Sequence, residues 1–352
     1  MERSKKPEKL SAQMKRKVDT VKETKKEYDG DIGTCISTGS TQLDLAISGG
    51  RVRGGGLPGG IFVEVFGPSG SGKTVLLCEI AGGVQRQGGE ARFDDPEARL
   101  NAIFAKMFGV TIDEKNYAKP DTVTQVFEAI RNWEPLPKKK GIIHGSFTDS
   151  LAALSTNMEM DNDEGDPFGG RRAKEFSEGL RKTCRLITDK NYLMVCSNQV
   201  RDVIGATQYQ EKTKSPGGKA LEFYPSLRLQ FTGVKKIKLD KTIAGKKQTR
   251  IIGVEAHVYV YKSSIWKPFR SAPVTIIFDY GIDVIRDNLQ FIKDNTTNTV
   301  YTLGGETLNK SMEESIKIVE EDNLEHELRE EVINLWEEIE SKFESNRKEK
   351  IR

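Results

Sequence analysis

The sequence has few of the residues that build disulfide-rich or zinc-binding proteins. Its 352 residues include four cysteines and three histidines, and no C-x-x-C pair. Cys35, Cys78, Cys184 and Cys196 lie 43, 106 and 12 residues apart, which matches no zinc or redox spacing. We therefore expect reduced, mostly buried thiols in a cytoplasmic protein, and no structural zinc site.

Long apolar runs are also missing. No stretch approaches the ~18 consecutive apolar residues that a membrane helix needs. The N-terminal residues MERSKKPEKLSAQMKRK carry charges but lack the apolar core of ~7–15 residues that a secretory signal has. Hydrophobic residues make up 36% of the chain and charged residues 30%, as in globular proteins. We expect a globular protein without a membrane segment, with two domains and a tail.

The net charge of +3 is small but unevenly distributed. Residues 1–30 carry +4, residues 301–352 carry −7, and the 270 residues between them carry +6. A basic body with an acidic tail suggests an anionic partner for the body. On charge alone, an ordinary solvated surface is the favoured interpretation.

The pattern of apolar residues predicts an α/β fold. Strand-like and helical segments alternate between residues 61 and 198: strands at 61–66, 90–95, 142–148 and 192–198, helices at 75–88, 97–108, 123–131 and 170–188. Strands that alternate with helices are parallel and joined by crossovers. From 226 to 285 strands follow one another without helices, which predicts an antiparallel edge of the sheet.

The remaining segments differ in composition. Residues 30–60 are rich in glycine and are expected to form loops, and residues 233–250 (GVKKIKLDKTIAGKKQTR) form a basic hairpin or loop. Residues 311–345 predict two amphipathic helices. An apolar stripe at Leu10, Met14, Val18 and Val21 predicts an N-terminal helix that needs another surface to rest on. We divide the chain into an N-terminal arm (1–32), a core (33–287) and a small acidic C-terminal domain (288–352).

Residues 67–74 (GPSGSGKT) fit the phosphate-binding pattern G-x-x-x-x-G-K-[ST]. A strand precedes them and a helix follows, which is the context that the pattern requires. Glycines let successive backbone N–H groups point at phosphate oxygens, and the helix N-terminus adds its dipole. The lysine supplies charge to the β- and γ-phosphates, and the threonine hydroxyl is a ligand for Mg²⁺. The predicted nucleotide site comprises Gly67, Pro68, Ser69, Gly70, Ser71, Gly72, Lys73 and Thr74.

Hydrolysis of a nucleotide needs two more carboxylates, one near Mg²⁺ and one beside the attacking water. Asp149 ends the segment IIHGSFTD and is the candidate on the Mg²⁺ side. Glu97 follows the strand RFDD and is the candidate base. On spacing alone, either residue could equally be a surface carboxylate or a helix cap.

Several motifs in the same order resemble the RecA-type recombinases, and more closely their bacterial and phage branch. The resemblance runs from Ile36 to about Phe343, and its motifs are STGSTQLDLAI, GGLPGG, RFDDPEARLNAIFAKMFGV, TDSLAAL, GDPFGGRRAKEFSEGLRK, SNQVRDVIG, SPGGKALEFYPSLRL and YTLGGETLNKSMEESIKIVEEDNLEHELREEV. It implies a RecA-like P-loop NTPase core with a mostly parallel sheet and antiparallel edge strands. An N-terminal helix and a small α-rich C-terminal domain would complete the fold.

The resemblance also implies roles for residues around the nucleotide. It places the catalytic glutamate at Glu97 and the Mg²⁺-side aspartate at Asp149, beside Thr74. Gln199 matches the glutamine that senses the γ-phosphate. Asn101, Phe104 and Phe278 match positions that hold the adenine, with Asn101 standing where the family has aspartate.

A second set of residues matches the family's DNA-binding positions. Three of them share a helical spacing, and four lie in or near the second DNA loop: Lys174, Ser177 and Arg181, then Arg201, Tyr209, Gly217 and Gly218. Because this loop has one extra residue, Gln208 is a rival match to Tyr209. The paired glycines would allow backbone to approach DNA phosphates closely.

Two departures from the family concern contacts between subunits. Lys262 matches the first of two lysines that reach the neighbour's nucleotide, whereas the second position is Ser264. Either Lys267 or Arg270 compensates, or hydrolysis is slower than is usual in the family. Glu222 stands where bacterial members carry a lysine, which implies an altered partner surface.

The resemblance implies an ATP- and Mg²⁺-dependent recombinase in the cytoplasm. It would form a helical filament on single-stranded DNA, pair with a homologous duplex, exchange strands and hydrolyse ATP when DNA is bound. One alternative is a ring-forming helicase on the same core, although the helicase N-terminal domain is missing here. Another is a regulatory paralogue that binds ATP and DNA but hydrolyses little, as Ser264 suggests.

Overall fold

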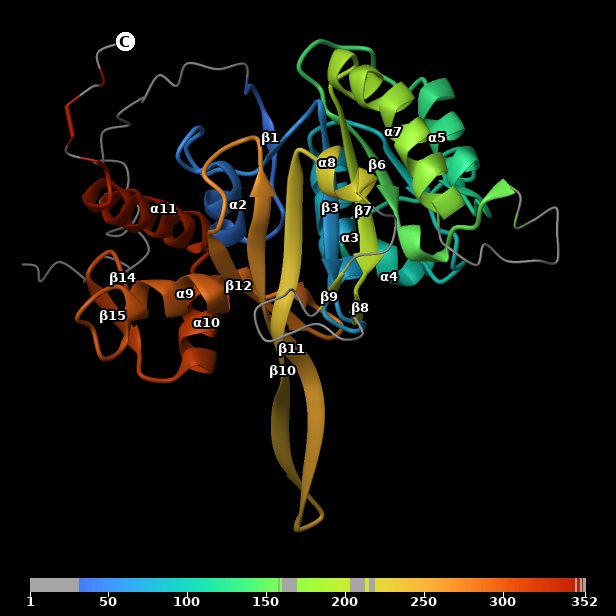
Figure 1. The fold of residues 1–352 in the computed structure, drawn as a ribbon. Coiled ribbons are helices and arrows are strands. Elements are labelled where there is room, and N and C mark those ends of the chain that lie inside the picture. The colour runs from blue at the N-terminus through green and yellow to red at the C-terminus, as the bar shows by residue number, and fades with distance from the viewer. Residues whose placement is uncertain are drawn as a thin grey trace, which may run out of the picture.

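The computed structural model describes residues 32–157, 159, 170–202, 213–214, 219–345, 347–348 and 350. A nine-stranded sheet forms the centre of this part of the chain (Figure 1). Its strands, in spatial order, are β13 (Gly281–Ile282), β12 (Ser271–Ile277), β11 (Lys246–Ser263), β10 (Leu227–Ile243), β3 (Ile61–Gly67), β7 (Tyr192–Gln199), β6 (His144–Thr148), β4 (Ala91–Asp94) and β5 (Tyr117–Ala118). Neighbours from β10 to β5 are parallel, and those from β13 to β10 are antiparallel. This confirms the predicted α/β core with an antiparallel edge.

Alternate residues of the central strands build two hydrophobic clusters, one on each face of the sheet. On β3, Val63 and Val65 belong to one cluster and Phe62 to the other. Val195 and Met194 divide in the same way on β7. This alternation follows from the two-residue period of a strand, and it makes both faces of the central strands apolar.

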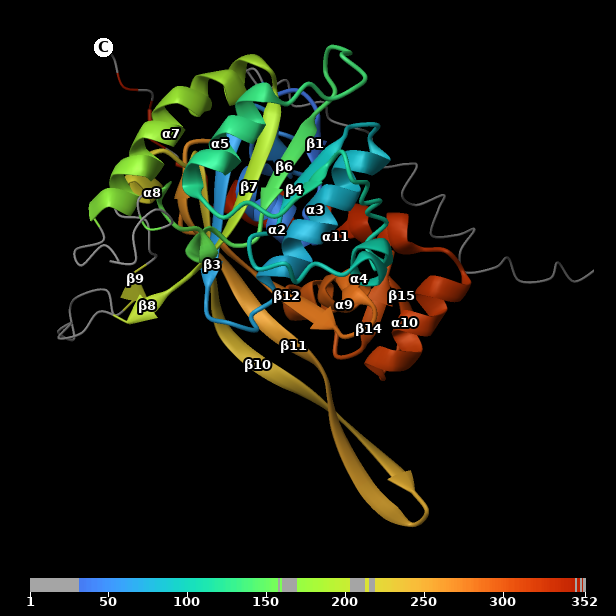
Figure 2. The ribbon, with the colours of Figure 1, turned by 90° about the vertical axis from the view of Figure 1, so that its right-hand side faces the viewer.

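Helices cover both faces (Figures 1 and 2). On one face lie α2 (Thr41–Ser48), α3 (Lys73–Arg86) and α4 (Ala102–Met107); on the other lie α5 (Val123–Asn132), α7 (Gly170–Asp189), α8 (Ala220–Phe223) and the short 3-10 helix η1 (Leu151–Ala153). Two-stranded pairs flank the sheet, namely β1 (Cys35–Ile36) with β2 (Leu57–Pro58), and β8 (Arg201–Asp202) with β9 (Thr213–Lys214). The stripe from Leu10 to Val21 lies outside the described residues.

The C-terminal part has a cluster of its own. Its elements are α9 (Val284–Asp294), β14 (Tyr301–Leu303), β15 (Glu306–Asn309), α10 (Met312–Glu321) and α11 (Glu325–Lys342). The two amphipathic helices expected within 311–345 are confirmed as α10 and α11. Leu45 of α2 also joins this cluster and so connects it to the core.

Two expectations from the sequence need correction. Residues 30–60 are not only loops, because α2 occupies Thr41–Ser48 and all eight of its residues are buried. The helix expected at 97–108 begins at Ala102, because the Asn101 side chain caps it by accepting a hydrogen bond from the Ile103 N–H at 2.7 Å. The basic segment 233–250 is a hairpin rather than a loop.

No helix in the described ranges is both long enough and apolar enough to cross a membrane. Cys78 and Cys196 are buried, whereas Cys35 and Cys184 are half-buried.

Candidate nucleotide-binding site

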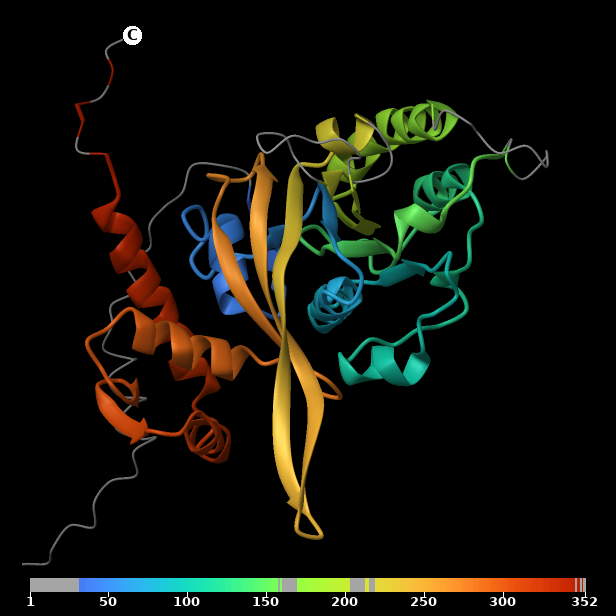
Figure 3. The same cartoon turned by 60° about the horizontal axis from the view of Figure 1, so that its bottom comes forward.

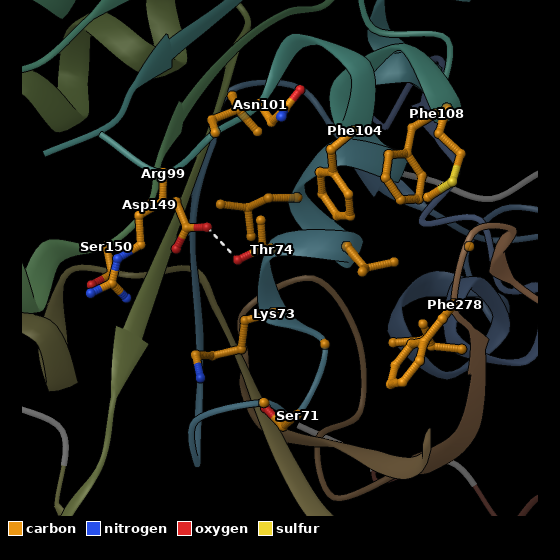
Figure 4. Close-up of a pocket in the computed structure, with 18 of the residues that line it drawn as sticks. Ser71, Lys73, Thr74, Arg99, Asn101, Phe104, Phe108, Asp149, Ser150 and Phe278 are labelled. Carbon is orange, nitrogen blue, oxygen red and sulfur yellow. Dashed lines mark hydrogen bonds between the residues drawn. The ribbon is translucent and has the colours of Figure 1, made fainter. Parts of the chain in front are cut away.

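A cavity of about 1060 Å³ opens beside the N-terminus of α3, where the phosphate-binding pattern lies. Its walls come from residues 69–77, from the segment between β4 and α4, and from the turn after β12. Figure 4 shows Lys73, Thr74 and Asp149 on one side of this cavity and the aromatic rings on the other. The sheet therefore gathers residues that are far apart in the sequence around one space.

Glycine is required where the loop meets the helix. Gly72 precedes α3 with φ +102°, a conformation that other residues rarely adopt. A Cβ atom there would lie 2.2 Å from Ile276 Cδ1, which is closer than two carbon atoms can approach. The absence of a side chain thus lets the loop turn under β12 and start the helix at Lys73.

The loop encloses a cation and an unsatisfied hydroxyl. Lys73 Nζ donates hydrogen bonds to the Gly67 and Pro68 carbonyl oxygens at 3.0 and 2.6 Å. Burial lowers the pKa of Lys73, and the carboxylates of Asp149 and Glu97 oppose this change. Among the described residues, Ser71 Oγ is buried and has no hydrogen-bond partner. A cation and an orphaned donor inside a glycine-rich loop fit a bound phosphate chain.

Two oxygen ligands suitable for Mg²⁺ meet at the end of the sheet. The Thr74 hydroxyl, on α3, donates to Asp149 Oδ2 at 2.5 Å, and Asp149 follows β6. The Ser197 hydroxyl on β7 donates to the other carboxylate oxygen of Asp149. Mg²⁺ is usually held by one or two protein oxygens together with phosphates, so this pair fits that ion. The described residues contain no group of three or more His, Cys, Asp or Glu that could hold a metal alone.

Glu97 lines the cavity with a partly exposed carboxylate. It pairs with Arg99 Nη1 at 2.6 Å and accepts a hydrogen bond from Ser150 Oγ at 3.3 Å. The two neighbouring aspartates are engaged elsewhere. Asp94 is buried beside Arg92, and Asp95 accepts hydrogen bonds from the Tyr117 hydroxyl and the Leu100 N–H at 2.8 Å each. The geometry therefore favours Glu97 over either aspartate as the carboxylate that acts in the cavity.

Aromatic rings line the other end of the cavity. Phe104 and Phe108 lie on one side, with their centroids 5.0 Å apart, and Phe278 faces them across the opening (Figure 4). Phe278 is 50% exposed, so its ring face is available to a ligand. Asn101 also lines the cavity, and its oxygen is occupied by the cap of α4, which leaves the amide nitrogen for a base. Such an arrangement can hold a planar base between rings.

Gln199 and Lys262 occupy different surroundings. Gln199 ends β7, lines the cavity and has an exposed side chain. Lys262, on β11, is not among the cavity residues; its Nζ donates to the Glu222 and Phe223 carbonyl oxygens at 3.0 and 2.6 Å. Burial lowers the pKa of Lys262, with a smaller contribution from the nearby Arg228. The structure thus brings Gln199, but not Lys262, to the candidate nucleotide site of its own chain.

The two candidates for replacing the lysine missing at Ser264 also differ. Arg270 lies 3.9 Å from the Trp266 ring centroid and forms an ion pair with Glu340 of α11. Lys267 is exposed, with its Nζ 5.6 Å from the same ring. Because Arg270 is held against the C-terminal helix, Lys267 is the better candidate to reach a neighbouring subunit.

The expected DNA-binding residues are only partly described. Lys174, Ser177 and Arg181 share one face of α7, and Lys174 and Arg181 are exposed. Phe176 and Leu180 on the opposite face are buried and orient the helix. The Arg201 backbone lies in β8, whereas its side chain lies outside the described part, as do Tyr209, Gly217 and Gly218.

The sequence analysis missed a buried polar network next to the site. Glu64 of β3 is fully buried; its carboxylate accepts from Arg228 Nε at 2.6 Å and from Asn198 Nδ2 at 3.0 Å. The Asn198 side-chain oxygen in turn accepts from the Gln199 N–H at 3.0 Å. A charged residue inside the apolar run IFVEVF was the signal that could have revealed this network.

Sequence comparison with known proteins identifies relatives of this chain. The model of the RecA N-terminal domain matches residues 13–283. "Protein RecA" of Thermus thermophilus is 35% identical over 252 residues, which is 72% of this chain and 69% of that protein. "Protein RecA" of Bacillus anthracis is 32% identical over 328 residues, 92% of this chain and 85% of that protein, and that of Colwellia psychrerythraea is 32% identical over 290 residues. The family model and these relatives show that this chain belongs to the RecA family of recombination ATPases.

Proposed function

We propose that this chain is a recombinase that assembles into helical filaments on single-stranded DNA in the cytoplasm and promotes pairing and strand exchange with a homologous duplex. The observation that carries the proposal is the cavity in which Lys73, Thr74, Asp149 and Glu97 converge. It combines phosphate binding, a place for Mg²⁺ and a carboxylate within one space. Family membership supplies the reaction class, a DNA-dependent ATPase that acts in recombination and repair.

Each residue in the cavity has a proposed task toward ATP and Mg²⁺. When bound, the ion would neutralise charge on the β- and γ-phosphates. Thr74 and Asp149 would hold the ion, and Lys73 would turn from the loop carbonyls toward the phosphates. Glu97 would accept a proton from the attacking water, and Ser150 and Arg99 would orient its carboxylate. Gln199 would donate its amide to the γ-phosphate and lose that contact after hydrolysis.

The position of Lys262 supports a reaction that is completed between subunits. The lysine lies outside the cavity of its own chain, so a role in catalysis would require its charge to act on a neighbour's nucleotide. A head-to-tail interface that does not close produces a filament. We assign residues 1–32 to the arm that docks on the next subunit, 33–287 to the core, and 288–352 to the small acidic domain.

The proposed DNA surface is built around α7. Lys174, Ser177 and Arg181 would bind the sugar-phosphate backbone of the single strand, together with Arg201, Tyr209, Gly217 and Gly218. Exposed cations at helical spacing suit a polyanion whose sequence is not read.

The test is electron microscopy of the full chain with single-stranded DNA and a non-hydrolysable ATP analogue, paired with an ATP turnover assay. We expect filaments and DNA-stimulated turnover, and we expect Lys73→Ala to lose both. Lys115→Ala is the matched control, because Lys115 is exposed and pairs with Glu90 away from the cavity. Rings would indicate a helicase, and filaments without turnover would indicate a regulatory paralogue.

A further inference from the structure

The hairpin of β10 and β11 continues far beyond the sheet. The pairing of β10 with β3 ends at Gln230, and the pairing of β11 with β12 begins at Gly253. Residues 234–251, which we call the ribbon, therefore pair only within the β10–β11 hairpin, and Figures 1–3 show them projecting away from the body. All of the ribbon's residues are exposed except Ile237 and Gln248, which are half-buried. A two-stranded ribbon of this kind gains little from burial.

The ribbon concentrates the positive charge of the molecule. It contains six lysines and one arginine against a single aspartate, a net charge of +6. This equals the net charge of all residues from 31 to 300, so the rest of that span has as many acidic as basic residues. The excess positive charge of residues 31–300 is therefore confined to this one projection.

The two faces of the ribbon differ in how their charges are paired. Residues directly opposite each other in a hairpin share a face. On one face, Asp240 accepts a hydrogen bond from Thr249 Oγ1 at 2.5 Å and pairs with Lys247 at 2.8 Å. Hydrogen bonds from Lys247 and Thr249 lower the pKa of Asp240, and the charge of the nearby Lys238 adds to this effect. We call this the paired face.

On the other face, Lys235 pairs with Glu255 at 3.7 Å near the sheet, whereas the cations closer to the tip have no acidic partner within the described residues. Leu239 lies opposite Arg250, Lys241 opposite Gln248, and Ile243 opposite Lys246. Within the described part of the chain, no carboxylate forms an ion pair with Lys241, Lys246 or Arg250. These three cations stand at successive levels about 7 Å apart, since two residues of a strand rise ~6.8 Å. We call this the basic face.

We propose that the basic face binds duplex DNA. Evenly spaced cations suit a regular polyanion, and the major groove of B-DNA, about 12 Å wide, admits a two-stranded β-ribbon. Arg250, Lys241 and Lys246 would contact phosphates, while Leu239 and Ile243, which are 40% and 61% exposed, would pack on sugars or thymine methyl groups. The proposal deepens the proposed function, which supplies duplex DNA as a partner, by assigning a surface distinct from α7.

The test compares two triple variants with equal loss of charge. Lys241→Ala/Lys246→Ala/Arg250→Ala removes the cations of the basic face. Lys236→Ala/Lys238→Ala/Lys247→Ala is the control on the paired face, because Lys236 and Lys238 alternate with the residues of the basic face along β10. Binding of a labelled 30-base-pair duplex of mixed sequence is measured by fluorescence anisotropy over a series of salt concentrations.

We expect the basic-face variant to bind the duplex more weakly. The negative slope of log Kobs against log salt concentration should become shallower by about 2.7, at ~0.9 for each of the three lost phosphate contacts. The paired-face variant should keep the wild-type slope within about one. Equal loss in both variants would refute the proposal, because diffuse charge would then explain binding. The proposal would also be refuted if the basic-face variant kept the wild-type slope for duplex binding. If that variant also self-associated more weakly in analytical sedimentation, the ribbon would instead contact the acidic helices of a second copy of this chain.

The same proteins separate this proposal from the proposed function. Both variants should form filaments on single-stranded DNA and hydrolyse ATP at the wild-type rate, because neither changes the cavity or α7. If the wild-type chain forms no filaments or hydrolyses no ATP, the proposed function fails, whatever the ribbon does with a duplex.

Discussion

The buried carboxylate of Glu64 offers a quantitative test of the packing beside the nucleotide site. Its ion pair with Arg228 joins β3 to β10, and the guanidinium also lies 4.6 and 5.1 Å from the ring centroids of Phe66 and Tyr261. Arg228 is 6% exposed, so water cannot take the place of the carboxylate. The substitution Glu64→Gln removes the charge and keeps the volume, which isolates electrostatics from cavity formation.

Breaking one partner of a buried ion pair costs about 3–5 kcal/mol, because the remaining charge stays buried without compensation. For a protein larger than 150–250 residues, ~1 kcal/mol corresponds to about 2 °C in Tm, so we expect Tm to fall by about 6–10 °C. The measurement is thermal unfolding of the nucleotide-free protein, followed by circular dichroism.

The matched control is Glu134→Gln on the surface. Glu134 forms ion pairs with Lys138 and Lys190 at 2.9 and 2.6 Å, and hydrogen bonds from these lysines lower its pKa to about 2. Its carboxylate is exposed, and surface pairs contribute little. We expect no resolvable change in Tm. If Glu64→Gln also melted within 2 °C of the wild type, the reasoning about the buried charge would be wrong.

Three further predictions concern catalysis and pH. Glu97→Gln should lower ATP turnover by ~10²–10⁴ while nucleotide and DNA binding persist; turnover within about threefold of the wild type would move the base to Asp95. Lys262→Ala should remove DNA-stimulated turnover but leave nucleotide affinity of the isolated subunit unchanged, and Ser264→Lys should raise turnover; unchanged rates in both would point to Lys267. Burial raises the pKa of Asp287 to about 6 from 3.8, so the folded state holds this proton more tightly than the unfolded state. The stability that Asp287 contributes is therefore lost as the pH rises from about 4 to about 6. Asp287→Asn should make the decline of Tm over this pH range shallower than in the wild type, and equal slopes of Tm against pH in the two proteins would contradict this.

The sequence by itself determined the features that depend on neighbouring residues. The phosphate loop could be found because eight consecutive residues, with a strand before and a helix after, carry its conformation and its charge. The alternation of strands and helices, and the amphipathic α10 and α11, followed from periodicity within single segments. The match of motifs to RecA-type recombinases likewise needed only their order along the chain.

Some local structure nevertheless escaped the sequence pattern. Helix α2 is buried on every side and flanked by glycines, so its eight residues show no amphipathic pattern to distinguish them from loops. The ribbon could be a hairpin or a loop, because its exposed lysines interrupt the alternation that marks a strand. Nine cross-strand pairs between residues 235 and 255 show that this segment is a hairpin.

Only the tertiary structure decided which distant residues meet. Thr74 and Asp149 are 75 residues apart, and Glu64 and Arg228 are 164 apart, yet parallel pairing of β3, β6, β7 and β10 places each pair in contact. The same packing held Arg270 against Glu340 and left Lys267 exposed, a choice that the sequence left open. Such contacts depend on the register between strands and on the burial of charge, and neither property belongs to any one segment of the chain.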